Sequence, residues 1–181
     1  MYFEEITKLI ATLRSYKSKV KLVSAGNFDL DLFPCMKIRG EISEFGYFSS
    51  FTLNCNSNGV DFYDLNKILK MRKFFDLDVK EYLVIADASG DPIAIGKDCN
   101  LYWSIHGGGE ADFNKIATSL EDFFATLTIF ATFYFGNFKR NIDNEDHGIN
   151  WDKYKIIKNA IINNGTEEDV ADNFLHCMLY L

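Results

Sequence analysis

The sequence predicts an α+β fold in which an antiparallel or mixed β-sheet is flanked by helices. Three short apolar segments in the middle of the chain are separated by only five or six turn-forming residues. Links of that length join antiparallel neighbours, because parallel neighbours need a long crossover. Segments with the three- and four-residue apolar spacing of amphipathic helices lie before and after them. A chain of 181 residues, 48% of them hydrophobic, is long enough to form a single domain with its own core.

A helix is predicted at the N-terminus, where apolar residues recur at helical spacing: Phe3, Ile6, Leu9, Ile10 and Leu13. Residues 47–53 have the composition of a strand, and the polar residues 56–59 form a turn that ends it. A short strand at 60–63 then leads into a helix at 65–75.

The three central segments are 82–86, 93–95 and 101–105, and we expect them to pair as an antiparallel meander. A helix follows, because Ser119 and Asp122 have the spacing of a capping box at a helix N-terminus. The apolar face of this helix consists of Leu120, Phe123, Phe124 and Leu127.

A helical extension is predicted at the C-terminal end. A polar link leads to one helix that begins near Trp151, and Gly165 suits the position just after its end. A last helix follows. We therefore divide the chain into an α+β domain at 1–136 and a link with C-terminal helices at 137–181. These helices either pack back on the domain or mediate homo-oligomerisation.

The charge distribution is uneven. Lys and Arg total 19 against 26 Asp and Glu, so the net charge of −7 disfavours nucleic acid as a partner. Between Asp76 and Asp122 there are ten acidic residues and three basic ones, and this excess equals the whole net charge. Such a region is either an ordinary solvated surface or one that steers a basic protein partner.

We expect a cytoplasmic location without membrane contact. The N-terminus lacks the apolar segment of a signal peptide. The most apolar stretch, 123–135, is much shorter than the ~20 residues that a membrane-spanning helix needs. The four cysteines, Cys35, Cys55, Cys99 and Cys177, are isolated in the sequence, so we expect reduced and mostly buried thiols.

No catalytic, cofactor-binding or metal-binding site is expected. Residues 106–109 (His-Gly-Gly-Gly) are similar to the oxyanion-binding strings of esterases, but the chain has no Gly-x-Ser-x-Gly motif to supply a nucleophile. The carboxylates of Asp29 with Asp31, and of Asp76 with Asp78, lack the further ligands of a metal site. The three histidines show no metal-ligand spacing.

Three segments, 83–95, 101–103 and 116–124, occur in an order that resembles the latter half of the SUKH superfamily. That superfamily contains the yeast Smi/Knr cell-wall regulators and many bacterial immunity proteins. Its pattern is a strand ending in Asp, a Gly-Asp turn, a further strand, an aromatic strand near a His, and a helix start with Ser, acids and Phe. The matching residues are Asp87, Gly90, Asp91, Trp103, His106, Ser119, Glu121 and Phe123. With a looser match from Gly59, the resemblance covers about 59–124, and the family's upstream pattern is not recognisable.

The resemblance implies an α+β fold, no catalysis and binding to protein partners. We expect an immunity protein that occludes a cognate basic toxin domain; the toxins of such bacterial proteins are frequently nucleases. The alternatives are a regulatory scaffold of the Smi/Knr type, assembled through 151–181, and a small hydrolase that uses dispersed Asp and His residues. We expect Trp103 in the core. The expected contacts are acids in predicted turns: Asp87, Asp91, Asp98, Glu110 and Asp112.

Overall fold

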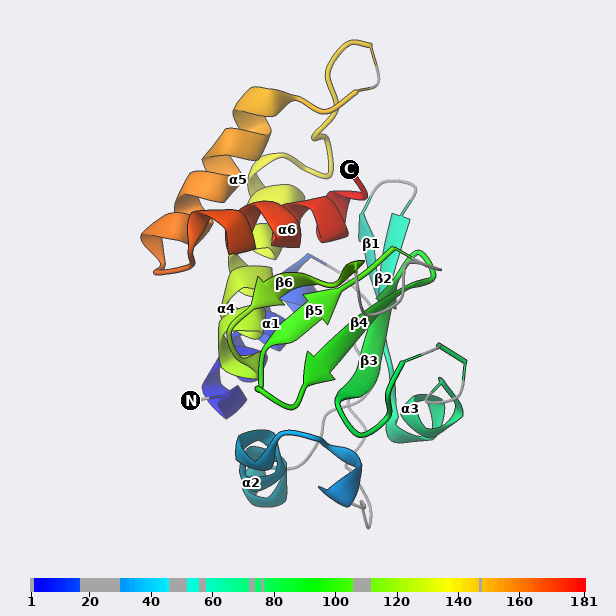
Figure 1. Cartoon of the computed structure of the whole chain (residues 1–181). Helices are drawn as coiled ribbons and strands as arrows, with labels where there is room; N and C mark the ends of the chain where they lie inside the picture. The colour runs from blue at the N-terminus through cyan, green and yellow to red at the C-terminus, as the bar shows by residue number, and fades with distance from the viewer. Residues whose placement is uncertain are drawn as a thin grey trace.

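The described part of the computed structural model is a six-stranded antiparallel sheet flanked by helices (Figure 1). This confirms the predicted α+β fold. Of the two predicted sheet types, antiparallel and mixed, the observed sheet is antiparallel. The structure describes residues 2–16, 30–45, 52–55, 58–71, 74–75, 77–105, 112–146 and 148–181.

The strands follow one another in the sheet in the order of the sequence. They are β1 (Thr52–Cys55), β2 (Asn58–Phe62), β3 (Tyr82–Ala88), β4 (Asp91–Gly96), β5 (Leu101–Trp103) and β6 (Asn114–Ala117). The predicted meander is therefore present as β3, β4 and β5. The two residues that join β3 to β4, Ser89 and Gly90, have φ of 55° and 98°. This is the left-handed geometry that a tight two-residue hairpin requires.

Six α-helices accompany the sheet in the described ranges, together with a 3-10 turn at Leu30–Leu32 and a π-helical turn at Thr132–Asn137. The predicted cap is present: the Asp122 amide donates to the Ser119 hydroxyl at 3.0 Å. Gly165 has a φ of 102° just after α5, as its predicted role requires. The helices are α1 (Tyr2–Ser15), α2 (Met36–Phe45), α3 (Leu65–Met71), α4 (Leu120–Ala131), α5 (Trp151–Asn163) and α6 (Glu168–Leu179).

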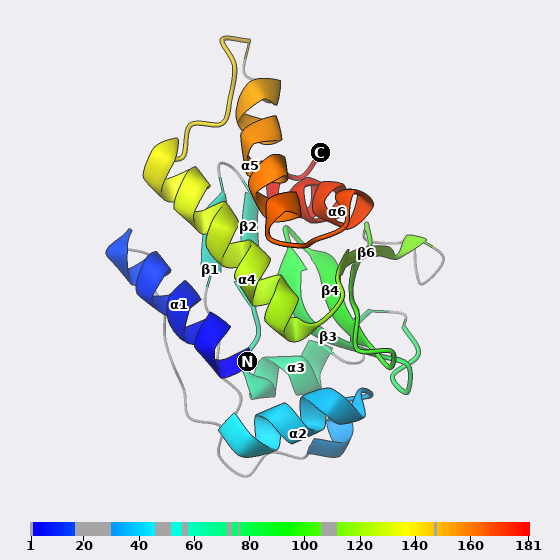
Figure 2. The ribbon, with the colours of Figure 1, turned by 90° about the vertical axis from the view of Figure 1, so that its left-hand side faces the viewer.

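The helices α4 and α6 cover one face of the sheet, and α1 packs on the outer side of α4 (Figure 2). Aromatic rings join the layers. The ring centroid of Phe123 on α4 lies 5.8 Å from that of Phe62 on β2 and 5.9 Å from that of Phe174 on α6. The C-terminal helices therefore pack on the domain. Among the described helices, none crosses the opposite face over β4 and β5, which is the face seen in Figure 1.

Two elements were not predicted, α2 and β6. In α2 the buried apolar pair Ile38 and Ile42 is a weak helical signal, and Gly40 between them argues against a helix. β6 has only four residues, of which Ile116 and Ala117 are buried. A segment so short carries little periodicity. The predicted strand at 47–53 lies largely outside the described residues.

The prediction of reduced thiols is wrong for two of the cysteines. Cys35 and Cys99 form a disulfide across a sequence separation of 64 residues. Spacing along the chain could not indicate this pair, because the fold alone brings the start of α2 to the β4–β5 turn. Cys177 is a buried thiol that forms no disulfide, as predicted, and the Cys55 side chain lies outside the described residues.

A disulfide is unusual in a reduced cytoplasm. The bond therefore gives no support to the cytoplasmic location expected from the sequence. As far as the chain is described, it contains no helix with both the length and the apolar character needed to cross a membrane.

Candidate functional site

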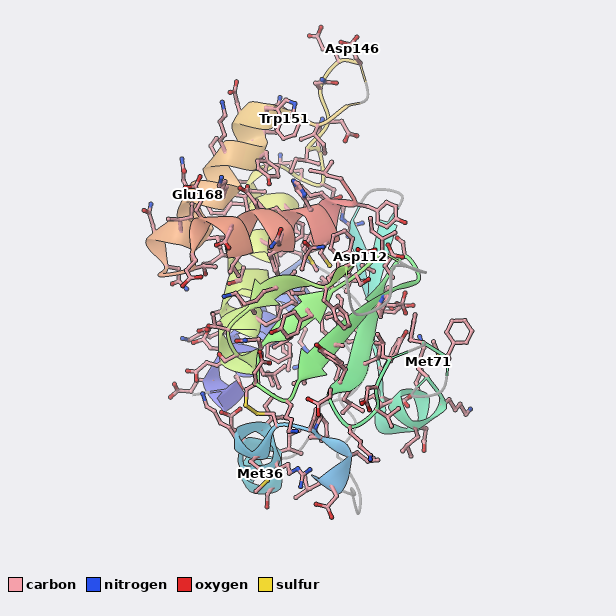
Figure 3. All side chains as sticks on the ribbon, viewed as in Figure 1. Met36, Met71, Asp112, Asp146, Trp151 and Glu168 are labelled. Carbon is pink, nitrogen blue, oxygen red and sulfur yellow. A yellow bond between two sulfur atoms is a disulfide. The ribbon has the colours of Figure 1, made fainter. Side chains whose placement is uncertain are left out.

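The acids expected at a partner interface lie at two opposite ends of the sheet. Asp87 and Asp91 flank the β3–β4 turn, whereas Asp98 lies in the β4–β5 turn at the other end of β4. Asp112 precedes β6 and is exposed at the same end as Asp91, near α6 (Figure 3). Glu110 lies outside the described residues. The predicted contacts therefore do not form one compact patch.

Asp87 is an anchor for the β3–β4 turn and for α3. Its Oδ1 accepts a hydrogen bond from the Gly90 amide, and its Oδ2 accepts one from the Tyr63 hydroxyl, both at 2.8 Å. The Lys67 ammonium lies 3.8 Å from the same Oδ2 and 4.1 Å from the centroid of the Tyr63 ring. Burial, and then the bond to Asp87, raise the pKa of Tyr63. Because these bonds occupy the carboxylate of Asp87, its main role is structural.

Asp91 is buried, not exposed in a turn as predicted. Its burial contradicts the expectation that it contacts a partner. It is the first residue of β4 and only 2% exposed. Side chains alternate along a strand, so Asp91 shares the helix-covered face with Ile93. The carboxylate repels the ionised form of the Tyr180 phenol and accepts its hydrogen bond, which raises the pKa of Tyr180. Trp103 is 5% exposed and lies in the core, as predicted.

Asp98 is an exposed carboxylate held in place by its own turn. Its Oδ2 accepts hydrogen bonds from the Tyr102 hydroxyl at 2.5 Å and from the Asn100 side-chain amide at 2.6 Å. Its Oδ1 accepts one from the Asn100 backbone amide at 3.1 Å. Burial alone would raise the pKa of Asp98, but the bonds from Tyr102 and Asn100 outweigh it and lower that pKa. Asp98 is therefore charged at neutral pH.

Three partly exposed aromatic side chains lie beside this carboxylate. The ring centroid of Phe113 is 4.7 Å from that of Tyr82 and 5.6 Å from that of Tyr102, and the two tyrosine centroids are 6.0 Å apart. Because Trp103 packs into the core under the helices, Tyr102 points to the opposite face. We call Tyr82, Asp98, Tyr102 and Phe113 the open-face cluster.

The three aromatic members of this cluster were not predicted from the sequence. Tyr82 and Tyr102 were predicted on strands, but neither was assigned to a face of the sheet. Trp103 was predicted in the core, and alternation around it was the signal that could have assigned Tyr102. No comparable signal existed for Phe113, which joins the cluster only through the fold.

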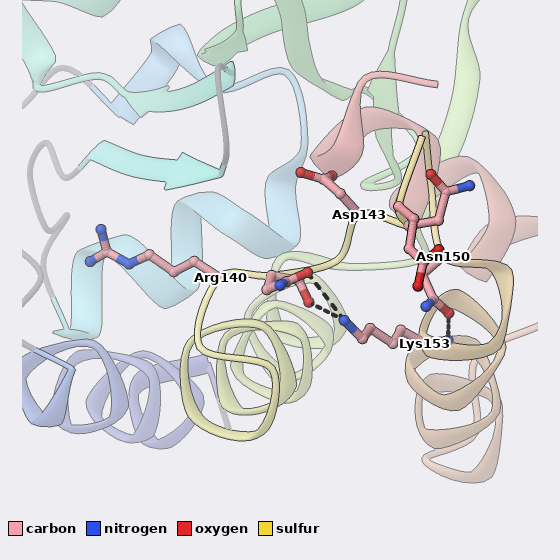
Figure 4. A pocket seen from close by; sticks show the side chains of 7 residues that line it. Arg140, Asp143, Asn150 and Lys153 are labelled. Carbon is pink, nitrogen blue, oxygen red and sulfur yellow. Dashed lines mark hydrogen bonds between the residues drawn. The ribbon is translucent and has the colours of Figure 1, made fainter. Parts of the chain in front are cut away.

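A polar cleft lies between the 138–150 link and the start of α5 (Figure 4). Its volume is about 680 Å³. The Lys153 ammonium is held there by the backbone carbonyl of Asn141 at 2.8 Å and by its side-chain oxygen at 3.2 Å. The acidic and basic side chains of the cleft are equal in number, so their charges balance and favour neither an anionic nor a cationic ligand. The lining residues are Arg140, Asn141, Asp143, Asn144, Glu145, Asn150 and Lys153.

Within the described ranges, no three His, Cys, Asp or Glu side chains gather as they would around a metal ion. Asp29, Asp76 and His106, weighed above as candidates for metal-binding or oxyanion sites, lie outside those ranges. The chain matches no protein-family model, no curated protein and no solved structure. The resemblance to the SUKH superfamily therefore stays a prediction from the residues.

Proposed function

We propose that this chain is a non-enzymatic protein-binding module, most similar in role to immunity proteins, that occludes a basic toxin domain. The observation that carries the proposal is the open-face cluster. Aromatic side chains supply large, rigid contact areas and are enriched at the centres of interfaces. A charged carboxylate beside them favours a basic partner and raises its rate of association.

The structure changes the proposed contact set. Asp98, Glu110 and Asp112 stay in it, Asp87 supports the turn beside it, and Asp91 leaves it. Asp98 and Asp112 are separated by about the length of β4, which has six residues and so spans roughly 20 Å at ~3.3 Å per residue. An interface of standard size covers ~800 Å² of each partner. One partner can therefore contact both acids together with the aromatic rings between them.

The test is co-expression of this chain with the polypeptide encoded immediately upstream of its gene, with bacterial growth as the readout. We expect that polypeptide to arrest growth and this chain to restore it. The double variant Asp98→Lys/Asp112→Lys should lose the rescue. The matched control, Glu145→Lys/Asp146→Lys, makes the same change of charge on the link at the far end of the molecule (Figure 3) and should retain it. No rescue, or equal loss in both variants, overturns the proposal.

A second candidate is a regulatory scaffold that assembles through its C-terminal helices. It is favoured by the exposed apolar side chains of Trp151 and Ile156 on α5, which are 58% and 48% exposed. Deleting this region is no test, because Phe174 on α6 belongs to the core. Trp151→Ala is the better variant. If the scaffold function holds, sedimentation will show an oligomer of the wild type that the variant converts to a monomer. A monomeric wild type contradicts it.

A further inference from the structure

The Cys35–Cys99 disulfide connects the start of α2 with the turn that carries Asp98. Cys99 lies between Asp98, which accepts a hydrogen bond from the Tyr102 hydroxyl, and Asn100, whose side-chain amide donates one to it. Its φ of 71° is in the left-handed region, where residues with a side chain are rarely found. Its amide donates to the Gly96 carbonyl at 3.0 Å. The covalent bond therefore restrains the one residue of the turn whose backbone is least favourable.

The other end of the disulfide is held independently of the bond. Phe33 and Ile38, on either side of Cys35, are buried in the core. The Arg39 guanidinium donates to the Phe33 carbonyl at 2.6 Å and to Asp31 Oδ1 at 2.8 Å. If the disulfide opens, the buried side chains of Phe33 and Ile38 still hold this segment against the core. The β4–β5 turn is held by hydrogen bonds of exposed and partly exposed residues, such as the bond from the Lys97 amide to the Glu81 carbonyl at 2.9 Å, so it is the segment that we expect to change.

The two sulfur atoms are also unequal toward a reducing thiol. Cys99 is partly exposed, whereas Cys35 is buried. Cys35 immediately precedes α2, and its carbonyl accepts the Arg39 amide hydrogen bond at 3.2 Å, which places it at the helix N-cap. Burial disfavours a thiolate at Cys35 and the helix N-terminus offsets part of that cost, so access to the sulfur decides which cysteine is attacked. Attack on the sulfur of Cys99, with Cys35 leaving, is the favoured route.

We propose that Cys35–Cys99 is a reversible thiol–disulfide clamp on the open-face cluster, opened by a dithiol reductant. One thiolate of the dithiol forms a mixed disulfide with Cys99 and releases Cys35. The second thiolate displaces Cys99, so that the dithiol is oxidised by two electrons to a disulfide. Both cysteines take up a proton and become thiols. The oxidised state holds Asp98 against Tyr102, and the reduced state lets the turn open. The consequence for partner binding rests on the proposed function.

The first measurement follows the clamp without any partner. Amide hydrogen exchange is recorded by NMR for the oxidised protein and after dithiothreitol, with thiol alkylation and mass spectrometry to count the opened cysteines. We expect both cysteines to react in the folded protein. The Asn100 amide, which donates to Asp98, should lose about tenfold or more of its protection, while Ala94 in the centre of β4 keeps its own.

Cys35→Ser is the matched variant, because serine retains the N-cap of α2 while removing the disulfide. It should reproduce the exchange pattern of the reduced wild type without dithiothreitol. Cys177→Ser, which removes a thiol outside the clamp, should respond to dithiothreitol as the wild type does. The proposal is overturned if the disulfide opens only in denaturant, or if it opens and the exchange at Asn100 does not change.

The second measurement separates the clamp from the proposed function. Poly-L-lysine is the basic probe, and its affinity for the oxidised and reduced proteins is compared at low ionic strength. A several-fold weaker affinity in the reduced state supports the regulation of binding. Unchanged affinity combined with faster exchange at Asn100 refutes the role of the open-face cluster in binding and leaves the clamp established.

Discussion

Removing the Cys35–Cys99 disulfide should destabilise the protein by an amount that the fold allows us to calculate. Its half-cystines are 64 residues apart. In the chain-entropy relation, closing a loop of that length lowers the entropy of the unfolded chain by about 14 cal/mol/K, which corresponds to a free energy of about 4 kcal/mol at 25 °C. The unfolding entropy of a chain of 181 residues is about 0.4 kcal/mol/K. The melting temperature should therefore fall by roughly 11 °C.

The assay is differential scanning calorimetry of the oxidised wild type, Cys35→Ser, Cys99→Ser and the double variant. Either single substitution breaks the same bond, so each single variant should lose as much stability as the double variant. A single variant that falls by less than about 2 °C would refute the entropic argument. Additive losses would show that the effect comes from local packing of each side chain. The clamp also requires the reduced protein to stay folded. This holds if the free energy of unfolding of the oxidised protein exceeds ~5 kcal/mol.

Three further variants test the packing and the polar contacts. Ser119→Ala removes the cap that the Asp122 amide uses, and denaturant unfolding should show a loss of about 1 kcal/mol. Phe174→Ala leaves a cavity between α6 and α4, so the same assay should show a loss of about 3–5 kcal/mol. Burial alone would raise the pKa of Asp172, but hydrogen bonds from Lys158 and Tyr154 hold it below its usual 3.8. Its stabilisation is therefore present above that pH and lost as the pH falls through the lowered pKa, a loss that Asp172→Asn should abolish in acid-unfolding curves.

The meander and its hairpin were predictable from the sequence because their signals are local. Ser89 and Gly90 lie between two apolar runs, and a two-residue link can join only antiparallel strands. Ser119 was predictable as a cap for the same reason, since it contacts an amide only three residues away. The disulfide and the position of Phe113 depend on contacts between distant segments. No local pattern contains that information.

The fate of the five predicted contact residues shows why the type of a residue does not determine its role at an interface. Asp91 and Asp98 both occur in turn-like sequence within two residues of a Gly, and both were predicted as contacts in turns. Asp91 begins a strand on the face that the helices cover, whereas Asp98 lies in the turn beyond the end of the same strand. Alternation along β4 puts the Asp91 carboxylate on the covered face, in the core, whereas Asp98 lies beyond the strand, beside Tyr102 in solvent. Faces of the sheet, more than acidic composition, therefore decide which of these residues a partner can reach.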